Sequence, residues 1–216
     1  MNAVTPSLWL TAAGLGAFHG VNPAMGWLFA LALGLYAHSR RVVLVSLVPI
    51  ALGHAASVAL VLAGVLTLGS VVDHETLARG SGVCLIGWGA WRAWRGHRGR
   101  PTVGMRTGLA GLALWSFVMS SAHGAGLMLV PALLPLCGGA GANAGAAGAS
   151  SAAAFEAGAL ALSVHTVAML AVIAVIALAA MSLHERTGLA FLRTGWVNVD
   201  WLWSVALIAC GIWLWV

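Results

Sequence analysis

Charged residues are scarce in this sequence of 216 residues, and lysine is absent altogether. Only 7% of the residues are charged, whereas roughly a quarter are charged in soluble domains. Hydrophobic residues make up 61% of the chain, and its mean hydropathy is +0.98. This composition excludes an ordinary soluble globular protein and predicts an all-α integral membrane protein, whose solvent is the lipid bilayer.

Several chemical signatures are also missing. The five acidic residues all lie in loops or at the ends of apolar segments: Asp73, Glu75, Glu156, Glu185 and Asp200. The lack of a mid-span carboxylate argues against a carboxylate-bridged di-iron centre and against a hard-cation site for Mg²⁺ or Ca²⁺. The three cysteines form no C-x-x-C pair, so we expect them to be packing residues. P-loop and H-E-x-x-H motifs are absent, so nothing indicates ATP-driven or hydrolase chemistry.

Six segments of the chain are apolar and long enough to be membrane spans, each of which needs about 20 residues. They cover residues 7–36, 42–69, 79–95, 107–136, 157–182 and 199–216. The first segment contains Gly20 and Pro23, and the fourth contains Gly124 and Pro131. Glycine and proline interrupt helices, so we expect breaks or gates at these four positions.

The arginines predict how these spans are oriented. They concentrate between spans one and two, three and four, and five and six. The positive-inside rule puts these three loops in the cytoplasm and both termini outside. We therefore expect a multi-pass protein of the cell membrane, in bacteria the inner membrane. We expect its net charge of +5 to reflect basic loops that interact with anionic lipid, and we expect no binding to nucleic acid. Trp203 is expected in the inner aromatic belt, and the glycine- and alanine-rich residues 138–152 in an external loop.

Two pairs of stretches resemble each other and indicate an internal repeat. "AFHGVNPAMGWLFALAL" is similar to "SAHGAGLMLVPALLPL", and "VPIALGHAASVALVLAGV" is similar to "GALALSVHTVAMLAVIAVI". The first repeat covers residues 7–95 and the second residues 107–216, within one transmembrane domain, 1–216. Because each half has three helices, the two halves point in opposite directions through the membrane. This inverted arrangement is typical of transporters, which bind substrate near the midplane between the repeats.

Each repeat carries two histidines inside its predicted spans: His19, His54, His123 and His165. An ionisable side chain inside the membrane is costly and usually faces the interior of the bundle. A single histidine there often only bonds a neighbouring helix, but four at repeat-related positions favour a common role. Neutral imidazole is the commonest protein ligand for metals, so the pattern predicts a transition-metal site.

Other side chains near these histidines are candidates for additional ligands or for supporting hydrogen bonds. Asn22 and Met25 follow His19, and Met119 and Met169 lie four residues from His123 and His165 respectively. Thioethers would favour a soft ion such as Cu(I), although methionine in a membrane helix is more often a packing residue. The metal itself is left open among Ni, Co, Cu, Zn and Fe.

The stretch "RRVVLVSLVPIALGHAAS" resembles the second helix of the NicO-type nickel/cobalt transporters of the lysine-exporter superfamily. The resemblance implies six helices in two three-helix repeats and a metal-binding first helix, in which His19 matches the family's first histidine. In place of the family's Asp-His pair, this chain has residues 22–25, "NPAM". His123 stands where we expect no histidine in that family.

Three functions follow from these observations. The leading hypothesis is a transporter of a transition-metal ion, which the four histidines would bind between the repeats. The second is a membrane metalloenzyme, an oxidoreductase for example, that holds copper, iron or zinc and admits a lipophilic substrate. The third is an exporter of a small organic solute that needs no metal. The expected partners are a metal ion and the lipid bilayer, and the sequence is also compatible with an oligomer.

Overall fold

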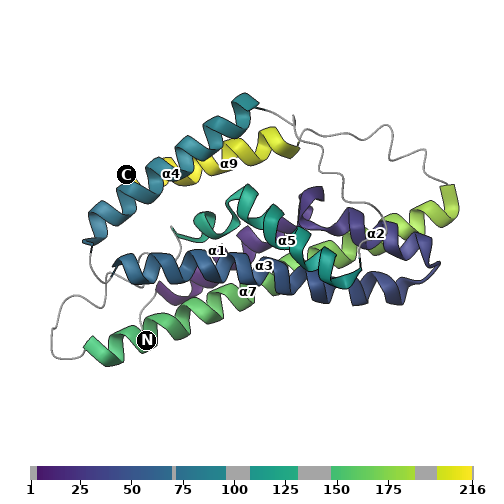
Figure 1. Cartoon of the computed structure of the whole chain (residues 1–216), viewed down its shortest axis with the longest axis horizontal. Coiled ribbons are helices and arrows are strands. Elements are labelled where there is room, and N and C mark those ends of the chain that lie inside the picture. Colours follow the sequence, from purple (N-terminus) through teal and green to yellow (C-terminus); the bar gives the residue numbers. More distant parts are fainter. Residues whose placement is uncertain (1–3, 70–71, 96–107, 131–146, 188–198, 216) are drawn as a thin grey trace.

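The computed structural model describes residues 4–69, 72–95, 108–130, 147–187 and 199–215, and within these ranges it is helical throughout its regular elements (Figure 1). The elements are α1 (Val4–Val21), η1 (Pro23–Met25), α2 (Trp27–Tyr36), α3 (Arg40–Gly69), α4 (His74–Arg95), α5 (Leu109–His123), α7 (Ala147–Thr187) and α9 (Val199–Trp213). The all-helical prediction is therefore confirmed for this part of the chain.

The first predicted span, residues 7–36, is not one helix. α1 ends just before Asn22, whose side-chain oxygen accepts a hydrogen bond of 3.0 Å from the backbone N–H of Ala24 and so begins η1. Gly26 has φ +124°, a conformation that favours glycine, and it separates η1 from α2. The chain thus changes direction in the middle of the apolar segment.

The helices pair across the two halves of the sequence. α1 lies along α7, α3 lies along α5, and α4 packs against α9 (Figure 1). Glycines allow the first two pairs to approach closely: a Cβ on Gly16 would collide with the backbone carbonyl of His165, and a Cβ on Gly53 with that of Ala113. Small residues are what permit close helix packing where both helices are apolar.

Polar side chains add hydrogen bonds between α3 and α5. The hydroxyl of Ser116 donates to the carbonyl of Ile50 at 2.8 Å, and the hydroxyls of Ser57 and Ser121 are also 2.8 Å apart. These hydroxyl bonds add specific polar contacts between two otherwise apolar helices.

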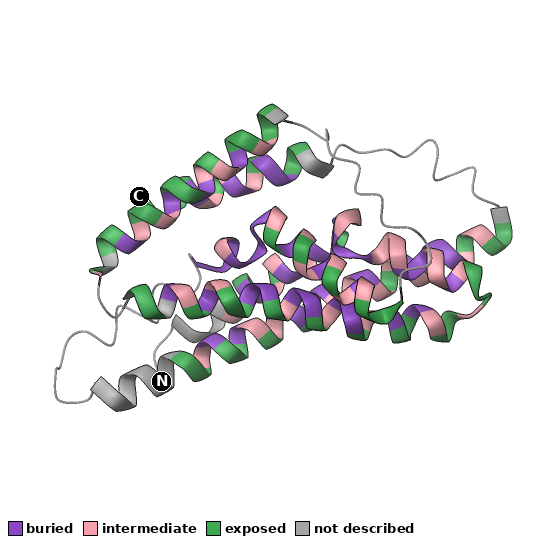
Figure 2. Cartoon of the chain, in the orientation of Figure 1, coloured by how far each residue is buried: buried purple, intermediate pink, exposed green. Residues whose placement is uncertain are grey.

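Buried and exposed residues alternate along α3 and α7 (Figure 2), and many of the exposed ones are large and apolar. On α3, Leu44, Val48 and Leu52 recur every four residues and are 48%, 60% and 64% exposed. By length and composition, the segments Arg40–Val65 and Phe155–Arg186 are each long and apolar enough to cross a membrane. Association of these two helices with a membrane therefore fits the structure.

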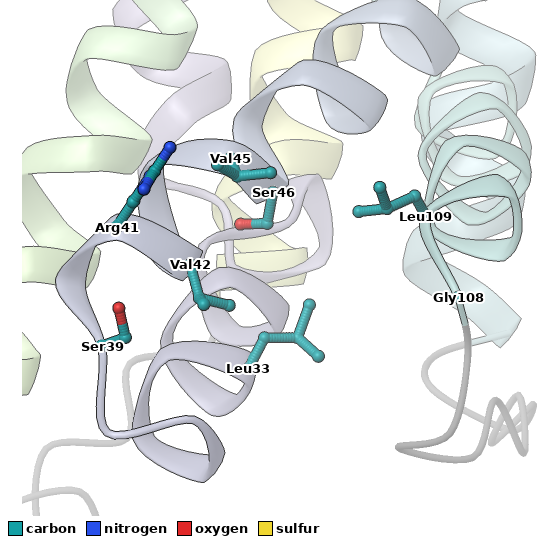
Figure 3. A pocket seen from close by; sticks show the side chains of 8 residues that line it. All are labelled: Leu33, Ser39, Arg41, Val42, Val45, Ser46, Gly108 and Leu109. Atoms are coloured by element: carbon teal, nitrogen blue, oxygen red, sulfur yellow. The ribbon is translucent and has the colours of Figure 1, made fainter.

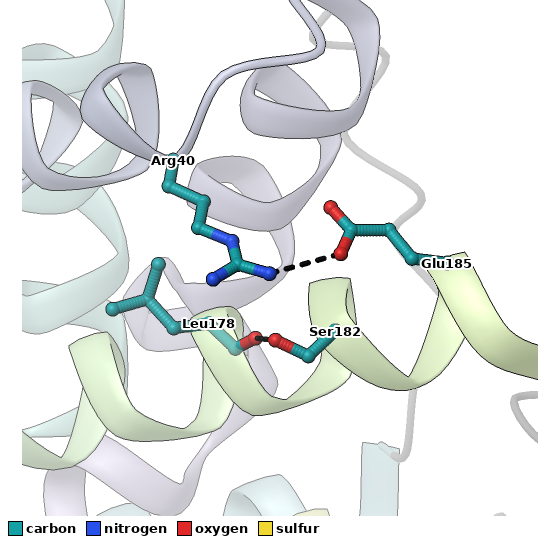
Figure 4. Close-up of polar contacts among 4 residues, drawn as sticks. All are labelled: Arg40, Leu178, Ser182 and Glu185. Carbon is teal, nitrogen blue, oxygen red and sulfur yellow. Dashed lines mark hydrogen bonds and ion pairs between the residues drawn. The ribbon is translucent and has the colours of Figure 1, made fainter.

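An ion pair joins the beginning of α3 to the end of α7. Arg40 donates to Glu185 at 2.9 Å, close to the point where Ser182 bonds the carbonyl of Leu178 (Figure 4). Both charged side chains are exposed, so the pair contributes little to stability but marks a polar end of the bundle.

The region between the fourth and fifth predicted spans is only partly described, and it differs from the prediction where it is. α7 begins at Ala147, so the end of the predicted loop 138–152 is helical; its earlier part, like Pro131, lies outside the described residues. Gly124 has φ +69° and ends α5, after which residues 125–130 continue as a helix.

Candidate functional site

Three of the four predicted histidines meet in the centre of the bundle. His19 is in the last turn of α1, and His54 and His165 lie within α3 and α7. The centre of the His19 ring is 5.8 Å from that of His54 and 4.8 Å from that of His165. The centres of the His54 and His165 rings are 5.3 Å apart. We call these three side chains the histidine cluster.

The histidine cluster is closed to solvent. His19 and His165 are 0% exposed and His54 is 1% exposed. Burial of a polar ring normally requires hydrogen bonds, because an unpaired buried polar atom is destabilising. Five ring nitrogens of the cluster nevertheless have no partner in ordinary hydrogen-bond geometry: Nε2 of His19 and both nitrogens of His54 and of His165. The backbone of Ala12 nevertheless lies close enough to interact with the His165 ring, so His54 is the member of the cluster with no polar partner on either nitrogen.

His19 is held in one orientation by its own helix. Its Nδ1 lies 2.7 Å from the carbonyl oxygen of Leu15. A carbonyl only accepts hydrogen bonds, so Nδ1 carries the proton, and Nε2 of the neutral ring keeps its lone pair for another partner. This is the second hydrogen bond that metal-binding histidines usually make.

His123, the fourth predicted ligand, lies apart from the cluster. It ends α5, and its Nδ1 donates to the carbonyl of Met119 at 2.8 Å, as His19 does to Leu15. Its Nε2 is 3.2 Å from a guanidinium nitrogen of Arg92, which therefore donates to it. Both ring nitrogens of His123 thus have partners.

Trp203 on α9 lies between His123 and the cluster. Its indole N–H donates to the carbonyl of His123 at 2.7 Å, and its ring stands perpendicular to that of His19 at 4.5 Å. The ring is also stacked on Phe18 at 5.0 Å and is completely buried. Trp203 was expected in an interfacial belt, and its position in the core corrects that prediction.

Side chains of α4 and α9 cap the C-terminal end of α5 by hydrogen bonds to its last carbonyls. The carbonyl of Ala122 accepts hydrogen bonds of 3.0 Å from both Trp88 and Arg92, next to the Trp203 bond described above. The last carbonyls of a helix have no partner within it, so these three side chains replace the missing bonds. Arg92 lies inside α4, and its side chain reaches this helix end.

The remaining predicted site residues have mixed positions. Asn22 is buried, but its oxygen is used by Ala24, and its amide nitrogen, which is unpartnered, cannot bind a metal. Met25 and Met169 belong to the main hydrophobic core, and Met119 is half-buried. Gly20 lies inside α1, where a Cβ would be only 2.6 Å from the carbonyl oxygen of Met169.

Two cavities of the described structure lie away from the histidine cluster. One of about 500 Å³ is lined by the start of α3 and the start of α5, and Figure 3 shows Leu109 across it from Val42 and Leu33. A second of about 300 Å³ is bordered by His38 and His184. Neither is lined by a member of the cluster, which is enclosed by packed side chains.

The cluster is not a ready-made metal site. Within the described ranges, no group of three or more histidine, cysteine, aspartate or glutamate side chains is already arranged to hold a metal ion. One reason is visible in the ring planes: His54 and His165 are stacked with 11° between them, and nitrogens of parallel stacked rings do not point at a common centre. A ring must turn before all three could bind one ion.

Comparison of the chain with known protein families, with curated proteins and with solved structures finds no match.

Proposed function

We propose that this protein transports a transition-metal ion across a membrane, and that His19, His54 and His165 bind the ion on its way. The observation that carries the proposal is the histidine cluster itself: three buried imidazoles from three helices, with five unpartnered nitrogens. A purely structural role would pair those nitrogens, because each unpaired one is destabilising.

The spacing of the rings supports one shared ion. A metal about 2 Å from one nitrogen of each ring places two ring centres about 5.1 Å apart at the tetrahedral angle and about 5.5 Å apart at 120°. The ring centres in the cluster are 4.8 to 5.8 Å apart. The ring centres therefore already lie at about the separation that one shared ion needs, and side-chain rotation would direct the nitrogens at it.

The helix pairing supports transport. We infer six spans in two inverted repeats, the first span consisting of α1, η1 and α2, as in the lysine-exporter arrangement that the sequence resembles. In this arrangement α1 and α5 are equivalent, and so are α3 and α7. Each first helix packs on the second helix of the other repeat, and His19 and His123 bond the fourth preceding carbonyl in the same way. Lipid would contact the apolar outer faces of α3 and α7.

The enclosure of the cluster then represents an occluded state. Alternating access would open it to one side of the membrane and then to the other by movement of one group of helices. Trp203 is the side chain that covers His19 from α9, so a movement of α4 and α9 together would uncover the cluster.

Ion flux into liposomes tests this proposal. Purified protein would be reconstituted with an ion-sensitive dye inside, and Cu⁺, Zn²⁺, Ni²⁺ or Co²⁺ would be added outside. We expect saturable flux of at least one ion, its loss in His54→Gln, and its retention in His184→Gln, a change at the far end of the same helix as His165. Flux equal to that of empty liposomes for every ion would refute transport.

A membrane metalloenzyme is the second candidate, and the complete burial of the cluster favours it. A site without solvent contact would release its ion slowly, as a permanent metal centre should. Metal analysis distinguishes the two: an enzyme would retain about one ion per chain through purification without added metal, and a transporter would lose it on dialysis against a weak chelator.

A further inference from the structure

We infer that the histidine cluster selects a soft monovalent cation, Cu(I), bound by three imidazole nitrogens and by no anionic ligand. This inference rests on the proposed function and names its cargo. It follows from the charges around the cluster, from the spacing of its rings and from the freedom of the His54 ring to turn.

The surroundings of the cluster carry no negative charge. The buried polar residues of the described structure are histidine, asparagine, serine and threonine, without a carboxylate among them. The charged side chain that reaches this region is Arg92, which is positive and bonds His123. Neutral imidazoles do not compensate the charge of a bound cation, so the ion keeps its full charge in a dry, apolar interior.

An uncompensated charge in this interior makes binding of highly charged ions unfavourable. The free energy of moving an ion from water into a medium of low dielectric constant rises with the square of its charge, so a divalent ion pays about four times the penalty of a monovalent one. Sites for divalent ions usually contain carboxylate or thiolate ligands that offset this penalty. The cluster contains neither, which favours Cu(I) over Zn²⁺, Ni²⁺ and Co²⁺.

The ring spacing favours three or four ligands over octahedral binding by the same three residues. Ligands at 90° around a metal at about 2 Å would bring the imidazole centres to about 4.5 Å from one another. All three measured separations are larger, from 4.8 to 5.8 Å. The cluster therefore suits an ion with three or four ligands, and imidazole nitrogen is a ligand that copper accepts.

The three rings can reach a common centre without losing a hydrogen bond. His19 stays fixed by Leu15 and presents Nε2. His54 has no hydrogen bond to break, so turning this ring out of the stacked pair costs only side-chain rearrangement. His123 would have to leave both Met119 and Arg92, which is why the site has three ligands and not four.

Competitive metal binding tests the inference. Wild-type protein in detergent, under anaerobic reducing conditions, would be titrated with Cu(I) against a chromophoric Cu(I) chelator. Zn²⁺, Ni²⁺ and Co²⁺ would be titrated by equilibrium dialysis with elemental analysis. We expect about one Cu(I) per chain, bound roughly 100-fold more tightly than any of the three divalent ions. We also expect loss of this binding in His19→Gln, His54→Gln and His165→Gln, and its retention in His123→Gln.

The outcomes separate this inference from the proposed function. A divalent ion bound as tightly as Cu(I) would overturn the choice of cargo while leaving metal transport in place. Loss of Cu(I) in His123→Gln, with the variant still folded by its thermal unfolding curve, would overturn the three-ligand site. Failure of the wild-type protein to bind any of the four ions would overturn both the cargo and the proposed function. The wild-type titration decides between cargoes even if one histidine variant does not fold.

Discussion

The indole of Trp203 stands at 90° to the imidazole of His19, with 4.5 Å between the ring centres. The edge of one ring meets the face of the other, an arrangement that aromatic pairs prefer. Because the same indole N–H bonds the carbonyl of His123, one side chain of α9 connects α1, α5 and the histidine cluster. The contact makes Trp203 both a packing anchor and the cover of the proposed ion site.

Replacement of this anchor should weaken the fold and expose the site. Trp203→Leu removes a fully buried ring and its hydrogen bond, and we expect a loss of about 3 kcal/mol in stability. Metal flux or exchange should become faster because the cluster is uncovered. Thermal unfolding in detergent and metal release after dilution measure the two effects. The control is Trp213→Leu on the same helix, where the ring is 76% exposed; equal effects in both variants would contradict the role of Trp203.

The close approach of α1 and α7 provides a second test. Gly16→Ala places a methyl group against the backbone carbonyl of His165, so the helices must separate and the rings of His19 and His165 move apart. Overpacking of this kind costs about 1–3 kcal/mol. We expect a lower unfolding temperature and at least tenfold weaker metal binding, roughly the consequence of a 1.4 kcal/mol change in binding free energy.

A matched control for this variant lies two residues away. Gly14→Ala is on the same helix, and nothing lies within 4 Å of the added methyl group. It should leave metal affinity unchanged and stabilise α1 slightly, because alanine favours helix more than glycine does. Unchanged affinity in both variants would show that the α1–α7 contact does not position the cluster.

Arg92 tests whether His123 supports the fold or binds the ion. Arg92→Gln removes the guanidinium that bonds His123 and the carbonyl of Ala122. We expect a loss of stability of about 1–3 kcal/mol, as for loss of a buried charged hydrogen bond. Ion stoichiometry should stay at one per chain. A second ion in this variant, measured by elemental analysis, would mean that Arg92 normally keeps His123 from binding metal.

Asp73 gives α4 a dependence on pH at the exposed start of the helix. The side chain and backbone N–H of Thr76 bond this carboxylate and hold its pKa below its usual value of 3.8. The folded state therefore favours the charged carboxylate, and this contribution to stability is present above pH 3.8 and is lost as pH falls below it. Asp73→Asn should unfold at a lower temperature near neutral pH, and its difference from the wild-type protein should shrink in acid. A difference that is constant with pH would contradict this cap.

The sequence was enough to predict that the described residues are helical and to select four histidines, three of which converge. It succeeded because apolar length indicates helices and because a buried histidine is rare enough to be conspicuous. It could not place Trp203, since a tryptophan near a helix end fits an aromatic belt as well as a core. The recurrence of Trp203, Leu207 and Gly211 every four residues, all of them buried, was the available signal.

His123 shows the limit of reasoning from repeats. Its position matches that of His19, and both bond the fourth preceding carbonyl. What separates them is the partner of Nε2, which for His123 is Arg92 and which for His19 is absent. That partner comes from α4, and no local pattern around His123 contains it. Equivalent residues of two repeats can therefore have different partners.

Metal content is the most direct test of the central claim, that His19, His54 and His165 together hold one ion. Wild-type protein and the three single His→Gln variants would be purified in mild detergent, loaded with candidate ions, desalted at once and analysed by elemental mass spectrometry, with His184→Gln as control. We predict about one ion per chain in the wild-type and control proteins and background levels in the three variants. Background metal in loaded wild-type protein, or undiminished metal in the variants, would contradict the account.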